Sequence, residues 1–177
     1  EDGEAMADGI KTACLVTDLG NVNDGTFHEF AYNGMLNAEE EFGLETTFIE
    51  TQSETDYAKN IDTCVQEGYD AVITVGFLIG DATLEAAEAN PETMFIGVDQ
   101  FFDAPPDNLV GIQYREDQGG FLAGALACMM TDSNVVGGVY GIDIPPAVKF
   151  RNGFENGCAY VNPDASILGV YVPSFTD

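Results

Sequence analysis

The stretch DAVITVGFLIGDATLEAAEANPETMFIGVD, residues 70–99, places an Ala- and Glu-rich segment between two short apolar runs. The runs 71–75 and 93–98 are typical of strands buried on both faces. The segment 81–90 predicts a short helix that ends before Pro91. Two strands joined through a helix lie parallel in one sheet, so this stretch predicts an α/β fold.

The same alternation extends along nearly the whole chain. Further strands are predicted at 11–17, 45–50, 108–113, 135–140 and 166–172, and further helices at 26–42, 53–68, 117–130 and 147–160. In the helix 117–130, Gly120 and Gly124 are expected to be small packing positions. We therefore expect mostly parallel sheets covered by helices.

The composition combines an ordinary apolar content with an extreme charge. The 177 residues are 45% hydrophobic, and 31 acidic against 5 basic side chains give a net charge of −26. So few Lys and Arg exclude duplex nucleic acid as a natural partner and argue against docking on an anionic membrane surface. The acid excess suggests a salt-adapted source, where screening weakens the repulsion, or else an acidic extracellular protein.

The first ten residues and the cysteines bear on the cellular compartment. Residues 1–10 are acidic and small, which predicts a linker ahead of the first strand, as in a mature exported chain or a trimmed one. The cysteines are widely spaced, without a CxxC pair, in apolar or helical stretches: Cys14, Cys64, Cys128 and Cys158. We expect buried free thiols, with a Cys14–Cys64 disulfide as the alternative, and no zinc site.

Acidic and aromatic side chains follow the predicted strands. In open α/β sheets this carboxyl edge is where ligands bind. A flat ligand suits such a set, because rings stack on a base for about 1–3 kcal/mol each and carboxylates accept from N–H and hydroxyl groups. A phosphorylated ligand would be repelled, and the chain has no Gly-rich phosphate loop. The candidates are Asp18, Phe27, Gly76, Phe77, Asp99 and Asp143.

The residues around the first of these strand ends also have structural explanations. Asp18 and Asp24 flank the start of the predicted helix 26–42, where a carboxylate caps free N–H groups. Phe27, the second residue of that helix, could be a core residue. His28 is the one histidine of the chain and could be a capped or surface side chain.

Catalysis, metals and cofactors find little support in the sequence. Asp99 and Asp143 could simply be turn residues. None of the four serines lies in a GxSxG motif, so no nucleophile and base can be paired. The oxygen-rich segment 18–25 lacks the glycine register and the final Glu of a calcium loop. We therefore expect a protein that is not an enzyme and that binds no metal or cofactor.

A series of sequence blocks occurs in one order along the chain. They are TD at 17–18, DGTF at 24–27, Gly34, YAKNID at 57–62, GYD at 68–70, TVGF at 74–77, FIGVD at 95–99, REDQG at 115–119, FLAG at 121–124, GIDIP at 141–145 and GFENG at 153–157. Together these blocks resemble the basic membrane protein family, the substrate-binding lipoproteins of ABC importers that include purine nucleoside receptors.

The resemblance implies a type I periplasmic-binding-protein fold, in which two α/β lobes close over a ligand. Residues 11–112 would form the first lobe and residues 113–177 the first part of a second, incomplete lobe, because family members are roughly twice as long. In purine-binding members the first Asp of the motif bonds the base and the Phe nine residues later stacks on it. These positions are Asp18 and Phe27 here.

The other site positions follow less directly from the resemblance. Asp24, Gly76, Phe77, Asp99 and Asp143 are carried over as further cleft positions. The family usually has Asn directly after the stacking Phe. His28 at this position is a departure that would alter contacts to the base or the sugar.

The resemblance also implies a function. We expect an extracytoplasmic, lipid-anchored protein that captures a purine nucleoside or a similar small ligand and delivers it to the permease of an ABC importer. One alternative is a structural, self-associating surface protein built from a truncated binding-protein fold. Another is a ligand-sensing regulatory module.

Overall fold

The computed structural model describes residues 9–173 and divides the chain into two compact units. The first unit ends at Gln113 and the second begins at Tyr114, and each is described by itself. Of the linker predicted for residues 1–10, residues 1–8 lie outside the described range.

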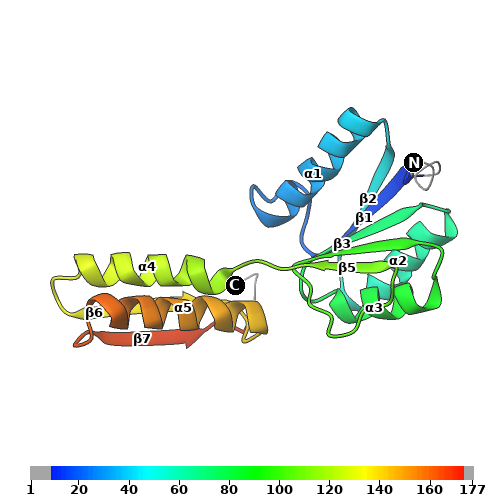
Figure 1. Cartoon of the computed structure of the whole chain (residues 1–177). Coiled ribbons are helices and arrows are strands. Elements are labelled where there is room, and N and C mark those ends of the chain that lie inside the picture. Colours follow the sequence, from blue (N-terminus) through cyan, green and yellow to red (C-terminus); the bar gives the residue numbers. More distant parts are fainter. Residues whose placement is uncertain (1–8, 174–177) are drawn as a thin grey trace, which may run out of the picture. The chain divides into compact units, whose positions relative to one another are not determined.

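The first unit is built on a sheet of five strands in the order β2-β1-β3-β4-β5 (Figure 1). All four ladders are parallel, as the strand–helix alternation predicts. The strands are β1 (Thr12–Leu19), β2 (Glu45–Thr51), β3 (Ala71–Val75), β4 (Met94–Val98) and β5 (Leu109–Ile112). The helices are α1 (Phe27–Phe42), the 3-10 turn Glu54–Asp56 with α2 (Tyr57–Gln66), and α3 (Gly80–Ala89).

Helices pack on both faces of this sheet and give the unit two cores. On one face Ile61 of α2 and Ile79, which directly precedes α3, share a core with the buried Val72 and Phe95. On the other face α1 covers Leu15 and other buried side chains, with Met35 at the centre of its contact. Burial on both faces explains why the central strands are apolar throughout.

The cysteines correct one prediction from the sequence. All four form disulfides, Cys14–Cys64 in the first unit and Cys128–Cys158 in the second, so the expected free thiols are wrong. Strand β1 packs against α2 with the Cα atoms of Cys14 and Cys64 5.9 Å apart, within the range that a disulfide spans. The alternative of a Cys14–Cys64 bridge is therefore confirmed.

The second unit packs two helices on a sheet of two parallel strands. Its elements are α4 (Glu116–Met130), β6 (Val135–Tyr140), α5 (Pro145–Val161) and β7 (Ser166–Tyr171). The helices approach each other through glycines: a Cβ on Gly120 or Gly124 of α4 would overlap the backbone of α5. This confirms both positions as small packing residues.

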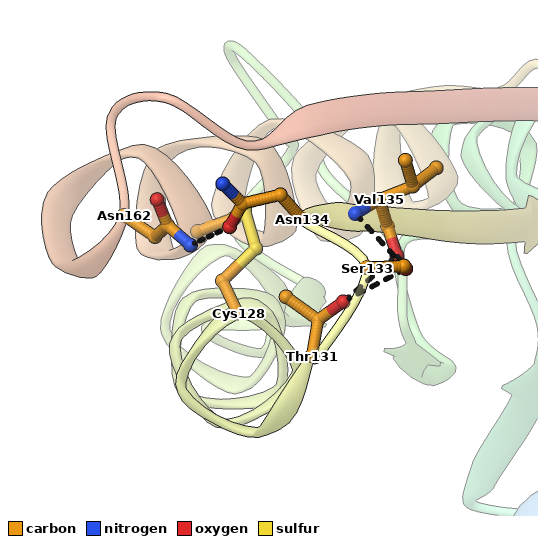
Figure 2. Close-up of a disulfide and its surroundings, with 7 residues drawn as sticks. Cys128, Thr131, Ser133, Asn134, Val135 and Asn162 are labelled. Atoms are coloured by element: carbon orange, nitrogen blue, oxygen red, sulfur yellow. Dashed lines mark hydrogen bonds between the residues drawn. A yellow bond between two sulfur atoms is a disulfide. The ribbon is translucent and has the colours of Figure 1, made fainter.

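The Cys128–Cys158 disulfide ties α4 to α5 near the turn that leads into β6 (Figure 2). In that turn the hydroxyls of Thr131 and Ser133 donate to the Val135 carbonyl, and Asn162 donates to the Asn134 side chain at 2.8 Å. The sheet face that carries Val139 and Leu168 stays exposed among the described residues. Within the same range, no helix is long and apolar enough to cross a membrane.

Candidate functional site

The candidate site lies where β1 and β3 end, at the carboxyl edge of the five-stranded sheet. The two strands pair in register as far as Thr17 and Val75, so Asp18 and Gly76 are the next residues on neighbouring strands. The Asp18 carboxylate lies directly over Gly76, because a Cβ built at position 76 would overlap it. Gly76 also has a φ of +116°, a conformation that glycine adopts readily. The sheet therefore needs glycine here to hold the Asp18 carboxylate.

His28, at the first turn of α1, joins two carboxylates through its two ring nitrogens. Its Nε2 lies 2.7 Å from Oδ1 of Asp18, and its Nδ1 lies 2.8 Å from Oδ2 of Asp24. The histidine is buried, with 8% of the residue exposed. A Cβ on Gly20 would overlap the imidazole, so the ring packs against the backbone that follows β1. These three hydrogen-bonded side chains, Asp18, His28 and Asp24, are the central feature of the site.

Both hydrogen bonds can be made at once only by the doubly protonated ring, since each nitrogen must donate to a carboxylate. Burial alone would lower the pKa of His28. The hydrogen bonds to Asp18 and Asp24 and the two negative charges outweigh burial and raise this pKa above its ordinary value. Geometry and charge therefore both favour an imidazolium between the two carboxylates.

Asp24 is in addition the capping residue of α1. Its carboxylate accepts from the backbone N–H groups of Thr26 at 2.8 Å, His28 at 3.1 Å and Glu29 at 3.2 Å. Burial is the largest single influence and opposes the charge, but the His28 side chain and these backbone donors together outweigh it and lower the pKa of Asp24 well below its usual range. The capping explanation for Asp24 is confirmed, with the histidine as an additional partner.

Two polar residues that the sequence interpretation missed support this edge. Gln100 is buried after β4, and its Nε2 donates to the Gly76 carbonyl and to Thr74 Oγ1, both at 3.0 Å. It thereby fixes the backbone below Asp18. Tyr57 of α2 buries a hydroxyl that has no hydrogen-bond partner. Burial, followed by the charges of Asp18 and Glu54, raises the pKa of Tyr57, so the hydroxyl is neutral near Asp18.

The aromatic candidates lie at the same edge. Phe27 is half-buried, packs against the α1 core and meets the His28 ring edge-on, with centroids 5.3 Å apart. Phe77 directly follows Gly76 and is also half-buried. Asp99 follows β4 with a φ of +63° and lies beside Gly76, because Val75 and Val98 are paired. These residues join Asp18 and His28 at one end of the sheet.

Asp143 belongs to the second unit, where it is exposed in the loop between β6 and α5. No group of three His, Cys, Asp or Glu side chains in residues 9–173 could hold a metal ion. The Asp18 and Asp24 carboxylates bind opposite nitrogens of one ring, so they do not converge on one point.

A family model described as "ABC transporter substrate-binding protein PnrA-like" matches residues 11–177. The chain belongs to this family. Basic membrane protein A of Borreliella burgdorferi is 32% identical over 170 residues, which are 95% of this chain and 50% of that protein. The "ABC transporter nucleoside-binding protein BmpA" of Lactococcus lactis is 29% identical over a gapped alignment of 183 positions, which covers 99% of this chain and 52% of that protein.

A solved structure supports the same assignment. The crystal structure of a solute-binding protein of an ABC transporter system from Aeropyrum pernix has a TM-score of 0.84 at 27% identity, over 94% of this chain and 48% of that chain. The predicted type I periplasmic-binding-protein fold is confirmed. The chain spans about half the length of these PnrA-like relatives.

Proposed function

We propose that this protein is an extracytoplasmic substrate-binding protein of an ABC importer and that it binds a purine nucleoside at the carboxyl edge of its first unit. Asp18 would accept a hydrogen bond from the base, and Phe27 would stack on it, with Phe77 and Asp99 beside them. The importer's permease would be the partner, and a lipid anchor would keep the protein at the membrane.

The observation that carries this proposal is the Asp18 carboxylate, fixed over Gly76 at the strand ends beside half-buried Phe27. Ligands of open α/β sheets bind at such an edge, and an aromatic face with a carboxylate suits a base with N–H donors. The Lactococcus lactis relative is named a nucleoside-binding protein, which points to the same ligand class.

Charge and disulfides support the ligand class and the compartment. With a net charge of −26 and acidic side chains at the site, an uncharged nucleoside is favoured over a nucleotide, whose phosphates would be repelled. Two buried disulfides are typical of proteins that fold in an oxidising compartment, as an extracytoplasmic protein does.

The experiment is a titration of the isotope-labelled chain with inosine, guanosine, adenosine, cytidine and ribose, followed by NMR up to millimolar ligand. Purine nucleosides should shift the amide signals of Gly76 and Phe77, whereas ribose should not. Phe27→Ala should abolish the shifts. The matched control Phe30→Ala removes a ring from the same helix that is 73% exposed, and it should bind normally.

A second pair of variants tests the carboxylate. Asp18→Asn should weaken binding, while Asp62→Asn, an exposed position on α2, should leave it unchanged. If no purine nucleoside shifts the amides at this edge, or if the Phe27 and Phe30 variants bind equally, the proposal is wrong.

A further inference from the structure

His28 occupies the centre of the site, yet its ring nitrogens face protein carboxylates on both sides. Nε2 is directed at Asp18 and Nδ1 at Asp24, at 2.7 and 2.8 Å. With both nitrogens engaged, the ring has no polar atom left to offer a ligand. Any effect of His28 on ligand binding must therefore be indirect, through a neighbouring residue.

The neighbour through which it can act is Asp18. His28 holds Oδ1 of this carboxylate, and the backbone of Gly76 lies directly beneath the carboxylate. The ring is itself fixed on three sides, by Asp24, by the Gly20 backbone and by the edge of Phe27. A carboxylate held in this way at one oxygen keeps the other, Oδ2, which is the oxygen nearest Gly76, in a single orientation although only 9% of the residue is exposed.

We propose that His28 is a positioning residue: as an imidazolium clamped between Asp24 and Asp18, it orients the Asp18 carboxylate so that Oδ2 accepts the hydrogen bond from the bound base. This inference rests on the function proposed above. It makes ligand binding depend on one proton, because neutral imidazole can donate to one of the two carboxylates but not to both.

Two carboxylates, Asp18 and Asp24, favour the charged form of the ring, and the other titratable groups nearby are acidic or neutral. Asp18 comes from β1, and Asp24 from the loop before α1. Behind Asp18 lie the neutral Tyr57 of α2 and Glu54 of the 3-10 turn. On α1 itself Glu29 accepts from the Gly25 N–H at 2.8 Å, and Glu50 of β2 accepts from the Val22 N–H at 2.9 Å. None of these groups is a cation that would compete with the imidazolium for the two carboxylates.

Because the chain has a single histidine, its ring signals can be assigned without ambiguity in the untagged protein. In nitrogen-correlated NMR spectra recorded from pH 5.5 to 8.5, both ring nitrogens should be protonated at pH 7. Adding guanosine should raise the midpoint of His28 titration, since a ligand that prefers the protonated site stabilises it. A ring that is neutral at pH 7 would overturn the inference, whatever the protein binds.

Ligand affinity supplies the second readout. The guanosine Kd should rise about tenfold as the pH passes the His28 midpoint, which is the effect of losing one hydrogen bond to a charged group. Asp24→Asn keeps a capping side chain but removes one negative charge, so both midpoints should move to lower pH together. His28→Ala, which leaves no donor to Asp18, should bind weakly with a flat pH profile, and Asp62→Asn should retain the wild-type profile.

These outcomes separate the two proposals. Absence of guanosine binding at every pH overturns the proposed function and, with it, the ligand-positioning role. Guanosine binding whose Kd does not change with pH, or that His28→Ala leaves intact, overturns the positioning role alone. A purely structural histidine would change stability in His28→Ala but would not couple the NMR midpoint to the ligand.

Discussion

Gly76→Ala should destabilise the first unit more than the same substitution at a glycine that also has a positive φ but has space for an added Cβ. At φ +116° an L-residue costs about 1–3 kcal/mol. The added Cβ would also displace the Asp18 carboxylate from His28. Losing that hydrogen bond between charged groups costs about a further 1.5–3 kcal/mol. We therefore expect a loss of about 2.5–6 kcal/mol in the free energy of unfolding.

The matched control is Gly68→Ala, because Gly68 has a φ of +82° and nothing within 4 Å of its added Cβ. It should cost about 1–2 kcal/mol, the backbone penalty alone. Urea unfolding followed by far-ultraviolet circular dichroism measures both, since the chain has no tryptophan to report by fluorescence. Equal losses in the two variants, or an unchanged His28 titration in Gly76→Ala, would refute the placement of Asp18 over Gly76.

Three further predictions concern stability. The double variant Cys14→Ala/Cys64→Ala opens a loop with a sequence separation of 50, so the free energy of unfolding should fall by about 4 kcal/mol on the chain-entropy relation. Hydrogen exchange in β1 and α2 should become faster, and unchanged exchange would contradict this prediction. Because the pKa of His28 is raised in the folded state, protonated His28 should stabilise the native state. This contribution should be complete below about pH 6.5 and should be lost as the pH rises through the folded-state pKa. The unfolding free-energy gap between wild type and His28→Asn should therefore shrink from pH 6 to 9, and a constant gap would argue against it. With a net charge of −26, the melting temperature should rise between 0.05 and about 1 M KCl, where the Debye length falls to about 3 Å; the opposite trend would show that repulsion does not limit stability.

The sequence predicts the strands well because their apolar runs are bounded by clear breakers. The strands 71–75 and 135–140 are observed with the same bounds, and the other predicted strands and helices occur with ends shifted by one to a few residues. The helix predicted at 53–68 begins as a 3-10 turn, with Ser53 accepting from the Thr55 N–H instead of opening an α-helix directly. Local hydrogen bonding of this kind changes helix ends without changing periodicity.

The cysteine prediction failed because spacing and local surroundings do not show which cysteines meet in the fold. Cys14 and Cys64 are 50 residues apart, and only the packing of α2 on β1 brings their Cα atoms to 5.9 Å. The pairing of Cys128 with Cys158 depends in the same way on the close approach of α4 and α5 through their glycines. Single-sequence periodicity identifies a helix face but not the partner that covers it.

The candidate site was predictable in position but not in its connections. Strand ends identified Asp18, Gly76 and Asp99, because parallel strands bring their carboxyl ends to one edge. Nothing in the spacing indicated that one histidine would bridge Asp18 and Asp24, since this depends on the path of the backbone through Gly20. A buried Gln100 was equally inaccessible, because an amide after a strand resembles an ordinary loop residue.

The geometry also gives the two carboxylates beside His28 different roles. Asp24 gives its carboxylate to three backbone N–H groups and to His28, so binding a ligand there would cost the helix its cap. Asp18 holds one ring nitrogen and has no such cap to maintain. A base that needs one acceptor should therefore choose Asp18. Asp24 acts indirectly: it helps to keep His28 protonated. Protonated His28 in turn orients the Asp18 carboxylate, which is the group that would bind the base.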